Sequence, residues 1–371
     1  MRRVFAVAAF VLAVLSPTAY ADAHSQLADN YGPGYAEIIA AANKEGKVVV
    51  YSVTSAVPLL LEDFQKLYPG VKLEYHALDT TPLYDRIVSE SAAGTAVGTM
   101  ADVAWSSAMD LQVKLVNDGY AQTYASPEAS KLPGWAIWRN EAYGTTSEPV
   151  GLVYNTRLLA PEEVPQDRAA LIRLLKSQPK RFNDKVVAFD PEKSGLGYML
   201  ATQDMSVSRE NFLDLARTLG DVKVRPGSGS GAMFALLGSG ECIIGYNLLG
   251  SYAAGRAKKD LPDLGVLLPK DYTLVMSRIM FITKKASHPN AARLWLDYVL
   301  SKRGQEIIAK SDLGSIRTDV EGEMTLAGLG KRLGNAVKPI AVGPGLLQFL
   351  EPAKRSEFIE QWKQSLRVGS K

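Results

Sequence analysis

The sequence predicts an α/β protein built as two lobes, and three observations lead to this fold class. Short apolar runs of strand length alternate with helical stretches, which is typical of parallel sheets that carry helices on their faces. The alternation occurs in two blocks, separated by a looser segment rich in aromatic and turn residues (125–149). The chain has 371 residues, more than one compact core of ordinary size holds, so two domains are expected.

The first block begins at Gly46. Its expected strands cover 47–53, 71–78 and 101–105, and its expected helices cover 57–70, 81–95 and 106–120. Pro58 suits the first turn of a helix, while Gly70 and Gly119 are helix stop signals. The strand runs are continuously apolar, as expected for strands that are buried on both faces.

The second block continues the alternation. Its expected strands are 150–155, 185–190, 222–224, 242–247 and 264–269, and helices are expected to begin at Ser194, Arg209, Gly229 and Ser251. One long strand over 272–286 and one helix over 290–310 follow, and the chain after Gly322 has a weaker helical pattern. We therefore expect lobe 1 to hold residues 22–150 together with 275–371, and lobe 2 to hold 151–274, with a β hinge between them.

The N-terminus has the layout of a cleaved secretory signal peptide. Arg2 and Arg3 precede an apolar run (4–15), and small residues follow it up to the expected cleavage near Ala21. The apolar run is too short to span a bilayer as a stable anchor. We expect residues 1–21 to be removed and the mature protein to be soluble and exported.

Charge and reactive residues exclude several functions. The formal net charge is +3 and the basic residues are scattered, so no basic stripe for nucleic acid is present. Cys242 is the only cysteine and lies in an apolar run, which favours a buried thiol. The three histidines, His24, His76 and His288, show no pairing with a nucleophile or a metal-ligand cluster. The sequence therefore predicts no enzyme activity, no metal site and no cofactor.

Hydroxyl and small residues follow the strands at the points where helices begin. Ligands of open α/β sheets bind beyond the carboxyl ends of the strands, and a helix N-terminus offers free N–H groups and partial positive charge to an anion. The candidate ligand-binding residues are Ser52, Thr54, Ser55, Ser106, Ser107, Ser194, Gly195, Asn247, Ser251 and Tyr252. Each serine alone is more often an ordinary helix cap than a ligand contact. The recurrence of such residues in both blocks is what favours a binding site.

Nearly the full length from about Gly46 to Arg317 resembles a known family. The stretches KVVVYSVTS, LEDFQKLYPGVKLEY, ADVAWSS, GLVYN and NAARLWLDYVLSKRGQEII are similar to those of periplasmic solute-binding proteins of ABC importers, in particular the ferric-iron-binding branch and its sugar-phosphate- and phosphonate-binding relatives. The resemblance implies a two-lobed, type II-like periplasmic-binding-protein fold with a ligand cleft at a β hinge. It also implies a monomer, located in the periplasm, that delivers its solute to an inner-membrane permease and its ATPase.

The resemblance leaves two kinds of ligand open. Ferric-binding relatives carry two adjacent tyrosines where this chain has Ser251 and Tyr252, and the broken pair, even with His76 or Glu148, is a poor ferric site. Relatives without the pair bind phosphorylated sugars and other organophosphates or phosphonates. We therefore expect a small phosphorylated organic anion, with Arg256 or Arg278 as possible charge partners, and ferric iron as the alternative.

Overall fold

The computed structural model describes residues 31–32, 34–55, 57–93, 100–311 and 313–368. The expected signal peptide (1–21) lies outside the described residues. Among the helices of the described part, none is long and apolar enough to cross a membrane.

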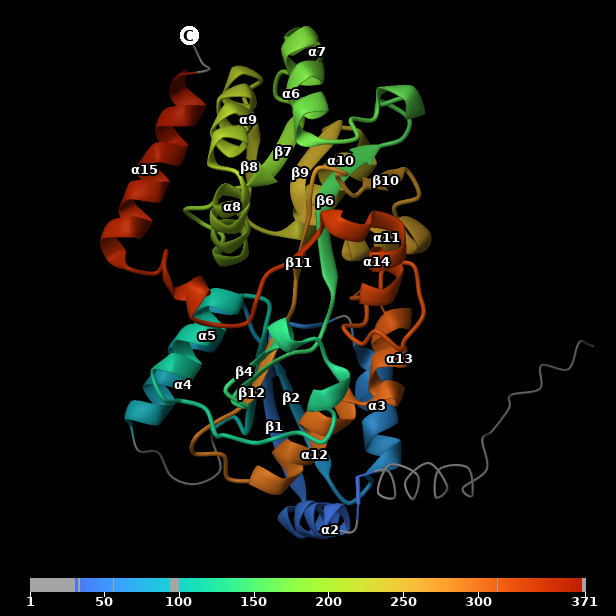
Figure 1. Cartoon of the computed structure of the whole chain (residues 1–371), viewed down its shortest axis with the longest axis vertical. Helices are drawn as coiled ribbons and strands as arrows, with labels where there is room; N and C mark the ends of the chain where they lie inside the picture. The colour runs from blue at the N-terminus through green and yellow to red at the C-terminus, as the bar shows by residue number, and fades with distance from the viewer. Residues whose placement is uncertain (1–30, 33, 56, 94–99, 312, 369–371) are drawn as a thin grey trace, which may run out of the picture.

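Two mixed sheets, one above the other in Figure 1, form the centres of two lobes. The sheet of lobe 1 has six strands in the order β2-β1-β3-β12-β5-β4. Their bounds are β1 Lys47–Ser52, β2 Lys72–Ala77, β3 Val103–Ser106, β4 Ile137–Trp138, β5 Ala142–Gly144 and β12 Ile279–Ile282. Strands β1, β2 and β3 are parallel, while β12, β5 and β4 add to them in antiparallel fashion. The parallel centre is the part that the alternating sequence pattern predicts.

The sheet of lobe 2 has seven strands, in the order β13-β11-β6-β9-β7-β8 with β10 also paired to β6. Their bounds are β6 Glu148–Asn155, β7 Val186–Phe189, β8 Arg225–Gly227, β9 Ile244–Leu249, β10 Leu264–Leu267, β11 Thr273–Met276 and β13 Val337–Pro339. Strand β7 runs parallel to β8 and β9, and β6 runs antiparallel to β9. The two sheets and their helices confirm the predicted α/β class and the two-lobed architecture.

Helices cover both sheets. Lobe 1 carries α2 Tyr35–Glu45, α3 Pro58–Leu67, α4 Thr80–Ala92, α5 Met109–Asn117, α12 Pro289–Leu300 and α13 Lys302–Lys310. Lobe 2 carries α6 Arg168–Ser177, α7 Pro179–Phe182, α8 Gly195–Val207, α9 Arg209–Asp221, α10 Ser230–Ser239, α11 Gly250–Lys259 and α15 Pro352–Val368. Helix α14 Leu326–Leu333 lies near α11 and α13 (Figure 1).

The predicted helix over 290–310 is two helices in the structure. The chain leaves helical geometry at Ser301, whose ψ is 158°, and the Ser301 hydroxyl accepts a hydrogen bond from the Gly304 N–H to begin α13. A serine with this geometry is a typical N-cap. The apolar periodicity of the sequence continues across Ser301, so only the capping serine marks where one helix ends and the next begins.

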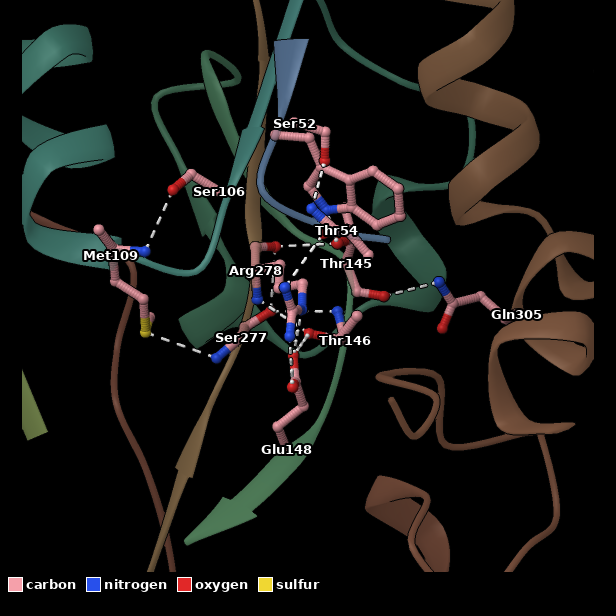
Figure 2. A network of polar contacts seen from close by, with 12 residues as sticks. Ser52, Thr54, Ser106, Met109, Thr145, Thr146, Glu148, Ser277, Arg278 and Gln305 are labelled. Carbon is pink, nitrogen blue, oxygen red and sulfur yellow. Dashed lines mark hydrogen bonds and ion pairs between the residues drawn. The ribbon is translucent and has the colours of Figure 1, made fainter. Parts of the chain in front are cut away.

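The predicted strand over 272–286 is likewise divided, and the division makes the hinge. Strand β11 pairs with β6 in the sheet of lobe 2, whereas β12 pairs with β3 and β5 in the sheet of lobe 1. Ser277 and Arg278 lie between them and cross from one lobe to the other beside residues 145–147. The Thr145 N–H donates to the Arg278 carbonyl at 2.9 Å, and the Arg278 N–H donates to the Thr146 hydroxyl at 2.8 Å (Figure 2). Two crossing segments tied together in this way are the predicted β hinge.

The C-terminal helix departs from the expected return of residues 275–371 to lobe 1. Helix α15 packs along α9 of lobe 2 (Figure 1), where Phe358 and Trp362 contact the ring of Phe212. Both α15 rings are buried, so the helix covers an apolar face of lobe 2 that would otherwise be exposed to water. The weak helical pattern after Gly322 predicts helix but does not indicate which lobe that helix packs against.

A buried carboxyl group ties the edge of lobe 1 together. The hydroxyls of Tyr35, Tyr124 and Ser126 donate to Asp297 at 3.0, 2.6 and 2.6 Å. Burial is the main cause that raises the pKa of Asp297 to about 7, against partly compensating hydrogen bonds from Ser126 and Tyr124. These hydrogen bonds join helix α12, which carries Asp297, to helix α2, which carries Tyr35. They also join α12 to the loop after α5, which carries Tyr124 and Ser126.

The raised pKa of Asp297 predicts a loss of stability as the pH rises. The folded protein keeps the proton up to about pH 7, whereas the ordinary pKa is 3.8, so the stabilising contribution is complete below about pH 4 and is lost toward pH 7. We expect Asp297→Asn to flatten this part of the curve of unfolding free energy against pH, by an amount on the order of 1–3 kcal/mol. Urea unfolding at several pH values measures the difference. Parallel curves for the two proteins would contradict the assignment.

Candidate ligand site

A cavity of about 630 Å³ lies between the lobes, next to the hinge. Its lining comes from four helix starts, from the ends of four strands and from the hinge. The lining residues are Val53, Asp79, Thr80, Thr81, Pro82, Ser107, Phe189, Lys193, Ser194, Gly195, Leu196, Ser228, Gly229, Ser230, Gly231, Leu249, Tyr252 and Arg278. The size is that of a site for a small organic molecule.

The N-termini of helices α4, α8, α10 and α11 all meet this cavity. The first N–H groups of a helix have no partner within it and carry partial positive charge. In α8 the Ser194 hydroxyl accepts from the Gly197 N–H at 3.1 Å, so this serine is a helix cap as well as a wall of the cavity. For α4, α10 and α11 the residue at the cap makes no side-chain cap hydrogen bond. Several backbone donors therefore remain available for an acceptor in the cavity.

The lobes approach each other closely across this cavity. A Cβ atom placed on Gly195 would lie 3.6 Å from the Thr80 hydroxyl oxygen of the opposite lobe. Helices α4 and α8, which begin at these two residues, are in contact. A small residue at the start of α8 therefore lets the two lobes approach this closely, with room for a methyl group but not for a long side chain.

Arg278 forms the hinge side of the cavity, and its guanidinium is held firmly. Its Nε and Nη2 donate to the two oxygens of Glu148 at 2.8 and 3.0 Å, and its Nη1 donates to the Thr54 hydroxyl at 3.1 Å (Figure 2). Arginine has five N–H donors, so three are used in these bonds and two are left. The fixed group can present its remaining donors to an acceptor without losing side-chain freedom on binding.

Two further charged groups line the cavity. Asp79 belongs to lobe 1, at the start of α4, and Lys193 belongs to lobe 2, just before α8. The Lys193 ammonium is 3.7 Å from Asp190, and its side chain is 72% exposed, so this ion pair is weak. Lys193 thus gives lobe 2 a positive group, and a carboxylate lies on lobe 1. At the hinge, Glu148 balances the charge of Arg278, which contributes its two remaining N–H donors.

The structure brings four of the ten predicted residues into the cavity, namely Ser107, Ser194, Gly195 and Tyr252. Arg278, named as a possible charge partner, also lines it, whereas Arg256 forms an ion pair with Asp260 at 2.7 Å and does not. The ion pair with Asp260, with a smaller contribution from Tyr252, raises the pKa of Arg256.

The other six predicted residues lie elsewhere. Ser52 and Ser106 are buried, and their hydroxyls accept N–H groups two residues further on, from Thr54 and Ala108, so they shape turns. The buried Thr54 acts on the cavity only through Arg278, and Ser55 is exposed outside it.

Asn247 and Ser251 do not line this cavity. Asn247 is buried in β9 with a φ of 60°, a left-handed backbone that asparagine adopts more readily than most residues. Ser251 faces a different cavity on the other side of α11. Adjacent helical positions point in directions about 100° apart, so Ser251 and Tyr252 cannot both face the cleft squarely.

Sequence reasoning did not assign a role in the site to Asp79, Thr80 or Lys193. The signal for the first two was present, because Thr80 and Pro82 open a helix in the same way as the residues after the first strand. Nothing in the pattern distinguishes Lys193 from a surface lysine.

The residues considered as helpers of a ferric site are engaged in other contacts. Glu148 is paired with Arg278, and the His76 ring packs edge-on against Tyr51 with centroids 5.5 Å apart. Tyr252 lines the cavity and packs against Phe234. Within the described ranges, no group of three or more His, Cys, Asp or Glu side chains is placed to hold a metal ion.

Comparison with known proteins identifies the family. The model of the bacterial extracellular solute-binding proteins matches residues 51–306. The substrate-binding protein of an ABC transporter from Agrobacterium tumefaciens is 38% identical, with 86% of this chain and 94% of that chain covered and a TM-score of 0.80. The chain therefore belongs to the bacterial extracellular solute-binding proteins, the receptors of ABC importers, which work with a permease and an ATPase. A search of curated protein sequences found no match.

More distant structures share the fold. The periplasmic binding protein AfuA from Actinobacillus pleuropneumoniae, with fructose 6-phosphate bound, is 19% identical over 87% of this chain and 99% of that chain, with a TM-score of 0.67. Iron-bound HitA from Pseudomonas aeruginosa is 16% identical over 86% and 99%, with a TM-score of 0.66. At this identity the two structures support the fold and leave the ligand open.

Proposed function

We propose that the cavity between the lobes binds a small phosphorylated organic anion, such as a sugar phosphate, which this periplasmic receptor delivers to its importer. The observation that carries the proposal is the meeting of four helix N-termini and Arg278 at one cavity. Backbone N–H groups at helix starts and a fixed guanidinium are the groups that recognise phosphate oxygens in proteins.

The distribution of charge suggests how the solute lies. The phosphate group is expected on the side of lobe 2 and the hinge, near Ser194, Lys193 and Arg278. The Asp79 carboxylate on the opposite wall would repel a second anionic group of the solute. A carboxylate can instead accept hydrogen bonds from hydroxyl groups of the solute. A molecule with a phosphate at one end and hydroxyls at the other fits both walls.

Closure of the lobes on the solute follows from the same arrangement. The solute would touch helix starts of both lobes, so binding favours the conformation in which the two walls are close. The near contact between Thr80 and Gly195 limits how far this closure proceeds.

Ferric iron remains the second candidate, because Tyr252 lines the cavity and a phenolate oxygen is a suitable ligand for this hard cation. Such a site would need further ligands from a bound anion. A solute that binds only together with iron would favour this candidate.

The cavity serines provide a test with a sugar phosphate as the probe. We expect Ser107→Ala combined with Ser194→Ala to weaken binding of fructose 6-phosphate by at least about a hundredfold, since hydrogen bonds to a charged group contribute roughly 1.5–3 kcal/mol each. Isothermal titration measures the affinity. Loss of the α8 cap also lowers stability, so each variant is titrated well below its own melting temperature.

The matched control combines Ser177→Ala with Ser239→Ala, two exposed serines whose hydroxyls donate to carbonyls in their own helices. This control is expected to bind as the wild type does. Equal affinities of the two double variants, or no binding of any phosphorylated solute to the wild type, would refute the proposed site.

A further inference from the structure

A second cavity, of about 480 Å³, lies on the other face of α11. Helix α11 contributes Ser251, Ala254, Gly255 and Lys258, which are spaced so that they share one helix face. The opposite wall comes from the end of α13 and from α14 with the residues before it, which Figure 1 places beside α11. Tyr252, on a different face of the same helix, lines the cavity between the lobes. The two cavities are therefore separate sites divided by α11.

The floor of the second cavity is apolar and incompletely covered. Val266, Met324 and Leu333 line it and are only half-buried. They pack around a small cluster of three buried residues, Leu268, Val275 and Leu329, which is separate from the larger cores. An apolar molecule in the cavity would remove these side chains from water, and this is the main favourable term for ligands in such pockets.

The polar groups of the cavity are mainly cationic. Lys258 and Lys310 line it and form no ion pair within the part of the chain that the structure describes. Arg332 is paired with Glu323 at 3.0 Å, which leaves the two lysines as the unbalanced charges.

A buried hydroxyl lies at the far end of the same helix face. Ser251 is 3% exposed, and its Oγ has no hydrogen-bond partner among the described residues. A buried polar atom without a partner is unfavourable and is rare in folded proteins. Seven residues of α-helix separate Ser251 from Lys258, a rise of about 10 Å. The cavity therefore has a cationic end and a hydroxyl end, with an apolar floor along it.

We propose that this second cavity binds an amphiphilic organic carboxylate with a medium-length apolar chain. The carboxylate lies at Lys258 and Lys310, the chain covers Val266, Met324 and Leu333, and a polar atom at the far end of the ligand bonds to the Ser251 hydroxyl. The proposal does not depend on which solute the cavity between the lobes takes.

Octanoate, octylamine and 8-hydroxyoctanoate serve as probes, titrated into the full mature protein by isothermal titration or ligand-observed NMR. Octanoate is expected to bind and octylamine, which has the opposite charge, is not. The terminal hydroxyl of 8-hydroxyoctanoate should improve affinity about two- to tenfold in the wild type, and Ser251→Ala should abolish that gain, because a neutral hydrogen bond contributes roughly 0.5–1.5 kcal/mol.

Variants of the lysines test the cationic end. Lys258→Gln combined with Lys310→Gln is expected to weaken octanoate about tenfold, whereas Lys259→Gln, on the next residue outside the cavity, should change it less than twofold. Ala254→Trp should abolish octanoate binding by filling the space, and binding of the cleft solute should persist. No octanoate binding at millimolar concentration, or equal affinity in the lysine double variant and the Lys259 variant, would overturn the proposal.

Discussion

Replacing Glu148 with alanine is expected to lower the free energy of unfolding by about 3–5 kcal/mol, the largest effect of any single substitution that we predict. Glu148 is fully buried, and both of its oxygens accept hydrogen bonds from Arg278, which is itself only 8% exposed. Loss of the carboxylate leaves a guanidinium buried at the hinge without its counter-charge. Urea unfolding of the mature protein at neutral pH measures the change.

Two further variants separate the unpaired charge from a general loss of packing. Glu148→Ala combined with Arg278→Met should be more stable than Glu148→Ala alone, because the buried charge is then removed as well. Glu321→Ala breaks an exposed ion pair with Lys331 and should change stability by no more than about 0.5 kcal/mol. If the double variant proved no more stable than the single one, the pair would not be what holds the hinge.

Replacing Gly195 with leucine is expected to weaken solute binding by about ten- to hundredfold while the protein stays folded. A leucine side chain at this position would extend toward Thr80 of the opposite lobe, since the Cβ position alone is 3.6 Å from the threonine hydroxyl. Overpacking of this kind costs about 1–3 kcal/mol, and this cost falls on the closed conformation. Titration calorimetry gives the affinity, and small-angle scattering shows whether the solute still compacts the protein.

The controls for Gly195→Leu are two glycine substitutions. Gly330→Leu, on an exposed helix position with no atoms within 4 Å of its Cβ position, should leave affinity unchanged. Gly195→Ala should retain most of the affinity, because 3.6 Å is an ordinary contact distance. Unchanged compaction and affinity in Gly195→Leu would show that the lobes do not close at this point.

The sequence predicts where helices begin relative to the strands. These helix starts account for the predicted site residues that do line the cavity. A strand run followed by a serine or glycine and a helical pattern fixes where Ser107, Ser194 and Gly195 lie, because strand ends of a parallel arrangement meet at one edge. The same local signals predict the α/β class and two lobes.

The direction of individual side chains could not be predicted. Ser251 and Tyr252 are neighbours in sequence but line different cavities on different faces of α11. Ser52 and Ser106 satisfy backbone N–H groups of their own turns, which is the ordinary role of serine and has no distinguishing sequence pattern.

Contacts between segments that are far apart in the chain could not be predicted from local sequence patterns either. The break at Ser277 and Arg278 assigns two halves of one apolar run to different sheets, and only the pairing with distant strands decides this. Helix α15 covers lobe 2 because Phe358 and Trp362 find an apolar face there, which depends on α9 far away in the chain.

The most direct test of the central claim is thermal unfolding of the mature protein with fructose 6-phosphate, fructose, inorganic phosphate, phosphonates and ferric citrate, each added separately. A solute at about 100 times its dissociation constant stabilises the folded state by roughly 2.7 kcal/mol, a shift of a few degrees for a protein of this size. The account predicts a shift with a phosphorylated or phosphonate solute, no shift with fructose and none with ferric citrate. A shift with ferric citrate alone would contradict the anion site and assign Tyr252 to an iron centre.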